Sequence, residues 1–262
     1  LGPNGAGKTT TIRLLLNLIR PTVGTASIMG MDVTTRSLDT RRLCGVVFSE
    51  PAFYGKLTGR SNLQLLQSYH VQGNSYTEEL AERLDLDLDR PVRALSRGNR
   101  QKLAIVQALS HRPQVLILDE PTSGLDPLVQ QEFYKILSEQ KGSGVTVFLS
   151  SHILSEVDRL CDRVGIIRDG HLVEVLDVPE LRKQHVRRME VTLNRDVAPS
   201  DFQGNGIEVI TVSGPYAEII VSGKLAELLE HLGTMPVENI VFPEASIEDT
   251  FNRYYGKRGE QT

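Results

Sequence analysis

The sequence predicts an α/β fold with a mostly parallel sheet, followed by a smaller α+β domain. Two observations carry this prediction. Continuous apolar runs, VLIL at 115–118 and VTVFL at 145–149, alternate with segments of helical periodicity, which is typical of buried parallel strands joined by helices. After Pro179 the pattern changes to short strands of alternating polarity. We therefore expect a first domain over residues 1–177 and a second over residues 178–262.

The composition limits the classes of partner. Among 262 residues, 40% are hydrophobic and 24% are charged, which is enough apolar material for one large or two modest cores. The net charge is −4, and the acidic excess lies in residues 178–262. No block of basic residues occurs, so we expect no nucleic-acid partner. No apolar stretch is long enough to cross a bilayer, and Cys44 and Cys161 are expected to be separate reduced thiols.

The chain opens on LGPNGAGKTT, which fits the phosphate-binding pattern G-x-x-x-x-G-K-[ST]. Glycines in such a loop let backbone N–H groups turn toward phosphate oxygens. The lysine reaches the β- and γ-phosphates, and the hydroxyl that follows it contacts Mg²⁺. The stripe Ile12, Leu15, Leu16 and Ile19 predicts a helix that continues to Pro21, and its N-terminus also faces the phosphates. The expected ATP-binding residues are Gly2, Pro3, Asn4, Gly5, Ala6, Gly7, Lys8, Thr9 and Thr10.

Such a loop usually follows a buried strand, and here only Leu1 precedes it. We therefore expect an N-terminal segment upstream of residue 1. After the first helix we expect strands at 25–30 and 44–48, and mixed, mostly helical structure over 56–93. A further helix is expected at 96–113, because a serine that suits an N-cap starts this segment and a proline stops it.

Two carboxylates, Asp119 and Glu120, follow the apolar run at 115–118. Adjacent carboxylates beside a buried strand repel each other, so a cation partner accounts for them better than a solvated acidic turn. We expect Asp119 to hold Mg²⁺ and Glu120 to polarise an attacking water.

A histidine, His152, follows the second apolar run, which is predicted to be a neighbouring strand. A lone histidine is more often structural than catalytic. However, the carboxyl ends of parallel strands meet at one edge of a sheet, where ligands bind. We therefore expect His152 to lie near Lys8 and Asp119, to contact the γ-phosphate and to orient the water.

The remaining elements are predicted from their hydrophobic patterns and turn residues. The stripe Val129, Phe133, Ile136 and Leu137 predicts a helix between the two apolar runs, and another is expected around Val157. A hairpin is expected at 164–176 around an Asp-Gly turn. In the second domain we expect strands at 189–193, 207–212, 217–221 and 237–242, and helices at 224–233 and 246–256.

A second helix N-terminus that suits a phosphate occurs in LSRGNRQKL at 95–103. The first helix already faces the bound phosphates, so a second such terminus on the same chain raises a geometric problem. The problem is solved if Ser96 and Gly98 serve the nucleotide of a second protomer.

Together these stretches resemble the ATP-binding subunits of ABC transporters. The motifs GPNGAGKTT, LSRGNRQKL, VLILDEP, SGLD and SSH occur in that order between residue 1 and about residue 175. The bacterial multidrug and polyketide-antibiotic exporters are the most similar group, because their signature has a basic second residue, like Arg97. Their C-terminal accessory domain also ends in a segment that SIEDTF at 246–251 resembles.

The resemblance implies a P-loop hydrolase core with a helical signature subdomain. It implies a head-to-tail homodimer, or a pair with another ATPase subunit, that holds two ATP molecules between one loop and the other signature. It also implies docking onto membrane-spanning permease subunits on separate chains, at the cytoplasmic face of the cell membrane. The implied residues are Ser96, Arg97, Gly98 and Asn99 in trans, Ser123, Gly124, Leu125 and Asp126 at the dimer contact, Thr9 and Asp119 at the metal, and Glu120 and His152 in catalysis.

The chain departs from the family at one metal-contacting position. The family has a glutamine there that touches Mg²⁺ and signals to the membrane partner, whereas this chain has Ser49, with Glu50 beside it as a candidate substitute. A second, milder departure is Asn99, which stands where the signature usually has Gln or Met.

Three alternatives remain for comparison. A soluble ABC-type ATPase acting on DNA or ribosomes would carry a long coiled-coil insertion or a second cassette, and this sequence has neither. An ATP-dependent clamp that barely hydrolyses is supported only by Ser49 and opposed by Glu120 and His152, so a turnover assay separates it. A GTPase is disfavoured because no N-K-x-D motif occurs.

Overall fold

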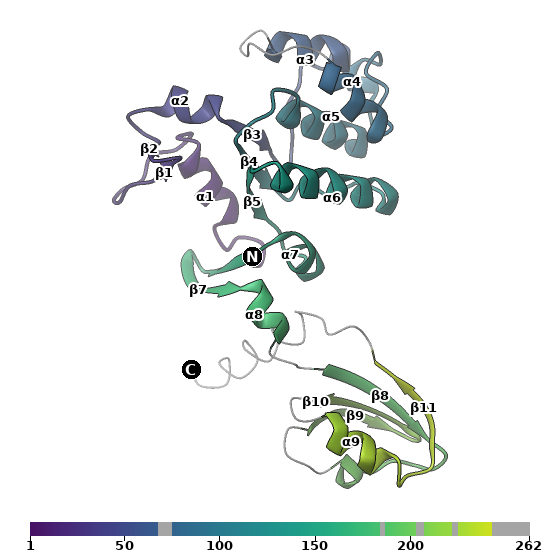
Figure 1. The fold of residues 1–262 in the computed structure, drawn as a ribbon. Coiled ribbons are helices and arrows are strands. Elements are labelled where there is room, and N and C mark those ends of the chain that lie inside the picture. Colours follow the sequence, from purple (N-terminus) through teal and green to yellow (C-terminus); the bar gives the residue numbers. More distant parts are fainter. Residues whose placement is uncertain (68–74, 184–186, 203–206, 222–224, 243–262) are drawn as a thin grey trace. The chain divides into compact units, whose positions relative to one another are not determined.

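The computed structural model in Figure 1 describes residues 1–67, 75–183, 187–202, 207–221 and 225–242. The chain divides into two compact units, Leu1–His152 with Ile166–Val173, and Ile153–Gly165 with Glu174–Thr262. The boundary expected after residue 177 stays a prediction.

The first unit is built on a parallel sheet of three strands in the order β3-β4-β5. This sheet and the helices that accompany it confirm the predicted α/β class. The elements are α1 (Lys8–Leu15), β1 (Ser27–Ile28), β2 (Met31–Asp32), α2 (Ser37–Arg42), β3 (Cys44–Val47), α3 (Gly59–Gln67), α4 (Ser75–Arg83), a short 3-10 helix (Val92–Ala94), α5 (Arg97–Ser110), β4 (Val115–Asp119), α6 (Pro127–Gly142) and β5 (Thr146–Ser150).

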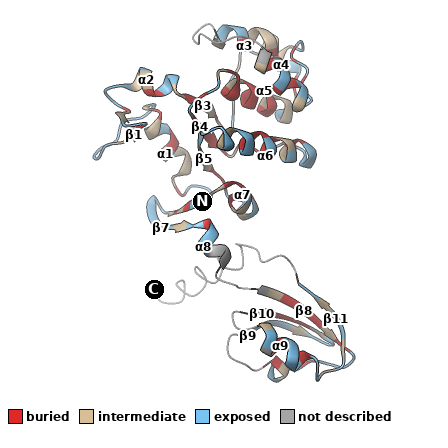
Figure 2. Ribbon diagram, in the orientation of Figure 1, coloured by how far each residue is buried: buried red, intermediate tan, exposed pale blue. Residues whose placement is uncertain are grey.

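Helices α1 and α5 pack on opposite faces of this sheet. Val115 and Ile117 of β4 join a buried cluster with Ile12 of α1. On the other face, β3 approaches α5 so closely that a Cβ on Gly45 would come within 2.0 Å of the Ala108 carbonyl oxygen, so only glycine fits there. Every residue of β4 is buried, as Figure 2 shows for the centre of this unit. The apolar run is therefore a central strand covered on both faces.

Two local predictions for the first unit are wrong, and one helix of this unit has no predicted counterpart. The helix after the phosphate loop ends at Leu15, because Asn17 has a φ of 51° and cannot continue a right-handed helix. The single strand expected at 25–30 is instead two short strands, β1 and β2, paired in an antiparallel hairpin. The sequence does not predict α2 at all, because its segment SLDTRR contains one apolar residue and therefore no stripe.

The second unit contains an antiparallel sheet in the order β11-β8-β10-β9. Its core includes Met189 and Ile219 from the sheet, Phe202, and Leu228 of α9, so the sheet is covered by a helix as expected for an α+β domain. The elements of the rest of the chain are α7 (Leu154–Leu160), β6 (Arg163–Arg168), β7 (His171–Asp177), α8 (Val178–Lys183), β8 (Arg187–Leu193), a short 3-10 helix (Pro199–Phe202), β9 (Ile207–Ser213), β10 (Tyr216–Val221), α9 (Leu225–Leu232) and β11 (Val237–Val241).

The hairpin expected at 164–176 is formed by β6 and β7. Its turn residues, Asp169 and Gly170, have φ values of 49° and 79°, which suits the Asp-Gly pair. The helix expected at 246–256, which includes the SIEDTF segment, lies outside the described residues.

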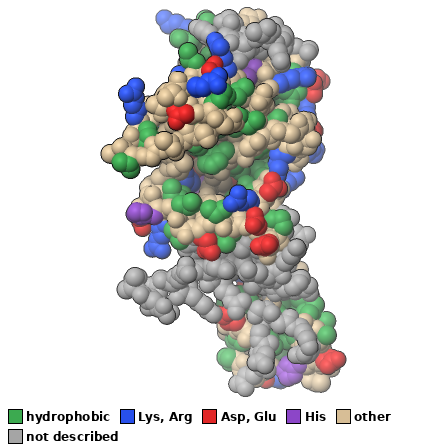
Figure 3. Space-filling view, turned by 60° about the vertical axis from the view of Figure 1, so that its left-hand side comes forward, with side chains coloured by type: hydrophobic (Ala, Val, Ile, Leu, Met, Phe, Trp, Pro, Cys, Tyr) green, Lys and Arg blue, Asp and Glu red, His purple; other side chains and the backbone are tan. Residues whose placement is uncertain are grey.

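The surface shows no single dominant charge on the face drawn in Figure 3, where basic and acidic side chains are interspersed. In the part of the chain that the structure describes, no helix has both the length and the apolar character needed to cross a membrane.

Candidate functional site

The glycine-rich loop is held in shape by the β6–β7 hairpin. A Cβ on Gly2 would lie 2.2 Å from the carbonyl oxygen of Ile167, so this position requires glycine. The Gly170 N–H donates to the Ala6 carbonyl at 3.0 Å. Gly7, with a φ of 108°, then leads directly into α1. The loop is thus fixed at a helix N-terminus, where free N–H groups and the helix dipole favour an anion.

Lys8 folds back over this loop. Its Nζ donates to the carbonyl oxygens of Gly2 at 2.6 Å and Pro3 at 3.1 Å, and it lies 3.5 Å from Oε1 of Glu120. The side chain is only 7% exposed. The ammonium group is therefore largely desolvated at the centre of the loop, where a phosphate oxygen would be a strong partner.

Thr9 and Asp119 bring two hard oxygen ligands together. The Thr9 hydroxyl donates to Oδ2 of Asp119 at 2.8 Å, although the two residues are 110 positions apart. Asp119 is 1% exposed, and its other oxygen, Oδ1, accepts a 2.5 Å hydrogen bond from the Ser150 hydroxyl. Mg²⁺ prefers a small number of carboxylate and hydroxyl oxygens beside substrate phosphates, so this pair fits the ion.

Glu120 stands between Lys8 and His152. Its Oε1 lies 3.5 Å from the Lys8 Nζ and 3.2 Å from Nδ1 of His152. Its backbone has a φ of 47°, which is uncommon for glutamate, and its N–H donates to the Ser150 carbonyl at 3.0 Å. Observed strain of this kind is often found at functional sites. We call Lys8, Thr9, Asp119, Glu120 and His152 the phosphate side.

A cavity of about 330 Å³ lies beside Thr9 and Asp119, and both Ser49 and Glu50 line it. The two residues at the family's glutamine position are therefore next to the candidate metal ligands. Arg13, one helical turn beyond Thr9 on α1, lines the same cavity. Arg13 is not among the predicted site residues, and its spacing of four residues from Thr9 is the signal that places it on this face.

The predicted signature residues lie at the start of α5. The Ser96 hydroxyl accepts from the Asn99 N–H at 3.1 Å and so caps this helix, as the sequence predicts. The Arg97 Nη2 donates to the Ser123 hydroxyl at 2.9 Å. The Asp126 side chain accepts from a backbone N–H in the first turn of α6 and so caps that helix. We call residues 96–99 and 123–126 the signature side. Within the described ranges, no hydrogen bond joins residues 96–99 to the phosphate side.

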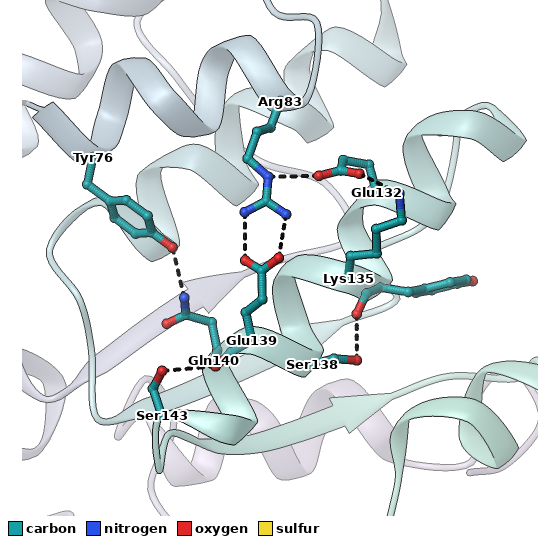
Figure 4. Close-up of polar contacts among 9 residues, drawn as sticks. Tyr76, Arg83, Glu132, Lys135, Ser138, Glu139, Gln140 and Ser143 are labelled. Atoms are coloured by element: carbon teal, nitrogen blue, oxygen red, sulfur yellow. Dashed lines mark hydrogen bonds and ion pairs between the residues drawn. The ribbon is translucent and has the colours of Figure 1, made fainter.

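Polar contacts also join α4 to α6, the helix that starts after the signature side (Figure 4). The Arg83 guanidinium forms two hydrogen bonds to Glu139, at 2.6 and 2.8 Å, and a third to Glu132 at 2.7 Å. The amide of Gln140 donates to the Tyr76 hydroxyl at 2.8 Å. The hydrogen bonds from Arg83 hold the pKa of Glu139 below its ordinary value. No pattern in the sequence predicts these contacts.

Comparisons with known proteins agree on one family. Residues 1–123 match the family model described as ABC transporter. The chain is 36% identical over 270 residues to the bacitracin transport ATP-binding protein BcrA of Bacillus licheniformis, an alignment that covers 98% of this chain and 87% of that protein. It is 33% identical over 263 residues to a fluoroquinolones export ATP-binding protein of Mycobacterium tuberculosis, with 98% and 83% covered.

A solved structure described as the ATP binding subunit of an ABC transporter is similar in both fold and sequence. It aligns with a TM-score of 0.65 and 32% identity, over 70% of this chain and 79% of that chain.

Proposed function

Because the chain belongs to the ABC transporter ATP-binding family, we propose that its ATP hydrolysis drives export through a membrane-spanning partner. The names of the bacitracin transport and fluoroquinolone export proteins support antibiotic-like cargo, since the similarity to each spans 98% of this chain. The single observation that carries the catalytic part is that Lys8 and His152 both approach Glu120, which directly follows Asp119 at the carboxyl end of β4.

We assign the binding of the β- and γ-phosphates to the loop N–H groups and Lys8. Thr9 and Asp119 would hold Mg²⁺, which when bound neutralises phosphate charge and fixes the phosphate orientation. Of Ser49 and Glu50, we assign the third side-chain contact to Glu50, because a carboxylate offers the ion a charged oxygen and both residues line the adjoining cavity.

In this mechanism Glu120 accepts a hydrogen bond from a water that lies in line with the γ-phosphate. The water oxygen bonds to the γ-phosphorus as the bond to the bridging oxygen breaks, which leaves ADP and inorganic phosphate. His152, 3.2 Å from Glu120, orients the carboxylate and the water. Lys8 stabilises the negative charge that develops on the phosphate oxygens.

The signature side is proposed to act on the nucleotide of a second protomer, a copy of this chain or a paired ATPase subunit. Ser96 and Arg97 are exposed at the N-terminus of the 14-residue helix α5, which suits a phosphate that arrives from outside the chain. Leu128, two residues after the signature side, is 83% exposed, as an apolar contact of a dimer would be in a single chain.

The permease is proposed to dock near residues 50–57, which would place the protein at the cytoplasmic face of the cell membrane. Tyr54 is 64% exposed and Leu57 is also exposed. A cavity of about 470 Å³ in the same segment is lined in part by Glu50, Phe53 and Arg93. Because Glu50 also lines the cavity at the candidate metal site, it connects the two.

Hydrolysis is tested by steady-state ATP turnover of the full-length wild type and Glu120→Gln, with MgATP binding measured on both. We expect turnover of the variant to fall by about 100-fold or more while MgATP binding remains, because only the polarising carboxylate is lost. A wild type that binds MgATP but turns over no faster than Glu120→Gln would contradict this proposal and support the clamp.

Export is tested in the native cells with the same substitution placed in the chromosome. Cells that carry Glu120→Gln should retain more labelled bacitracin or labelled fluoroquinolone than wild-type cells. Equal accumulation of both compounds would contradict export of these two classes.

A further inference from the structure

Arg97 connects the two segments of the signature side. Its Nη2 donates to the Ser123 hydroxyl at 2.9 Å across 26 positions of sequence. Its alkyl stem lies over Gly124, since a Cβ on Gly124 would be 3.5 to 3.6 Å from Cγ, Cδ and Nε of Arg97. Gly124 has a φ of +80°, a conformation that glycine adopts without cost and can also leave easily. Arg97 therefore restrains a part of the chain that is otherwise permissive.

Two further contacts fix the relative position of these segments. A Cβ on Gly98 would lie 2.6 Å from the Gly124 carbonyl oxygen, so the two backbones are in close contact. The Gln101 side chain is buried and its Nε2 donates to the Pro121 carbonyl at 2.9 Å. The first turn of α5 thus cannot slide along residues 121–124 without breaking a buried hydrogen bond.

We propose that Arg97 is a positioning residue that makes residues 96–99 and 123–126 one preformed surface for the nucleotide of the partner protomer. The inference rests on the proposed head-to-tail dimer. Arg97 acts through Ser123 and Gly124 and not on ATP itself. Fixing both segments before the protomers meet lowers the entropy lost on closure, so the gain appears in dimer formation and turnover.

A direct role for Arg97 is the competing explanation. A guanidinium has five N–H donors, and only one is used on Ser123 in the structure. An arginine that contacted a phosphate of the partner's ATP would matter whether or not Ser123 carried a hydroxyl. The serine is therefore the residue that separates the two explanations.

The experiment uses the full-length protein with Arg97→Met, Arg97→Lys, Ser123→Ala and the double variant Arg97→Met/Ser123→Ala. Methionine keeps an apolar stem over Gly124 but removes every donor. Arg90→Met is the matched control, because Arg90 is exposed and its side chain makes no hydrogen bond or ion pair with the residues that the structure describes. The readouts are kcat and KM for ATP, thermal unfolding, and ATP-dependent dimerisation of each variant combined with Glu120→Gln.

We expect Arg97→Met and Ser123→Ala each to lower kcat/KM by about five- to tenfold, as loss of one hydrogen bond would. The double variant should be no worse than the poorer single variant, because both changes break the same contact. Arg97→Lys should recover part of the loss, while the thermal midpoint and the Arg90→Met control stay unchanged. Dimerisation should require correspondingly more ATP.

Two results would overturn the inference. One is a loss in Arg97→Met with wild-type kinetics in Ser123→Ala, which would mean that Arg97 contacts ATP directly. The other is wild-type kinetics in both single variants. If Glu120→Gln with Arg97 intact fails to dimerise, the proposed dimer has failed, and this inference fails with it.

Discussion

The phosphate side and the signature side differ in how many of their contacts form within one chain. On the phosphate side, Thr9 bonds to Asp119, and Lys8 and His152 both approach Glu120. On the signature side, Ser96 caps its own helix and makes no hydrogen bond to the phosphate side within the described residues. One chain therefore brings the proposed catalytic groups together but presents its signature outward.

Burial separates the two sides in the same way. Asp119 is 1% exposed, whereas Ser96 and Arg97 are exposed. Buried polar groups keep their hydrogen bonds without a ligand, because breaking them would leave them desolvated and unpaired. An exposed helix N-terminus gains a partner only when another molecule meets it. The difference suggests that nucleotide binding belongs to one chain and hydrolysis to two.

The variant Ser96→Arg tests this comparison most strongly, because it is expected to have the largest effect on ATP turnover. A long cation at the start of α5 should block the meeting of two protomers and lower turnover by about 100-fold. MgATP binding by the single chain should not change, because the phosphate side is untouched. Turnover assays and nucleotide-binding titrations check this, with Ser143→Arg as the control at an exposed serine after α6. Loss of MgATP binding in Ser96→Arg would break the comparison.

A smaller effect is expected from His152→Ala. The histidine touches the Glu120 carboxylate, so its loss should lower kcat by about tenfold or more through misorientation of the proposed base and its water. The KM for ATP should stay within about twofold, because the proposed phosphate contacts of the loop are left intact. Steady-state kinetics measure both values. A rise in KM with an unchanged kcat would assign His152 to binding instead.

A still smaller effect is expected from Glu50→Gln. Removal of one carboxylate beside the metal should raise the Mg²⁺ concentration for half-maximal turnover by about fivefold, on the scale of a partly exposed charge pair. The Ser49→Ala variant should leave that concentration near the wild-type value. A magnesium titration of turnover compares them, and the reverse ranking would move the metal contact to Ser49.

The smallest effect is expected from Arg83→Met, which removes the hydrogen bonds of Arg83 between α4 and α6 (Figure 4). The free energy of unfolding should fall by about 1 kcal/mol at neutral pH. Because Arg83 lowers the pKa of Glu139 in the folded state, this contribution is present above the ordinary value of 4.5 and is lost as the pH falls below it. Denaturant unfolding at several pH values measures it. An equal difference between wild type and variant at low pH would contradict the ion-pair explanation.

The sequence predicts which residues of the phosphate side lie together, because parallel pairing decides their positions, and their roles stay a prediction. Asp119 ends β4 and pairs in register with Ser150 at the end of β5, so His152 must follow at the same edge. The fold class follows from the same apolar runs. The choice between Ser49 and Glu50 does not, because a loop carries no period that tells which side chain faces the metal.

Side-chain contacts of Arg97 and Arg83 lie beyond what the sequence predicts. Arg97 meets Ser123 across 26 positions, and Arg83 meets Glu139 across 56. Such pairs depend on how helices pack, and neither pattern nor propensity encodes that distance. The early end of α1 has a similar origin, since the left-handed backbone of Asn17 overrides an apolar stripe that continues to Ile19.

The central claim is that the signature of one chain serves the nucleotide of another. The most direct test is the mass of full-length Glu120→Gln in solution, measured by size exclusion with light scattering, with and without saturating MgATP. The account predicts a monomer without nucleotide, a dimer with MgATP, and a monomer again when Ser96→Arg is added. A protein that stays monomeric while fully occupied by MgATP would contradict the claim.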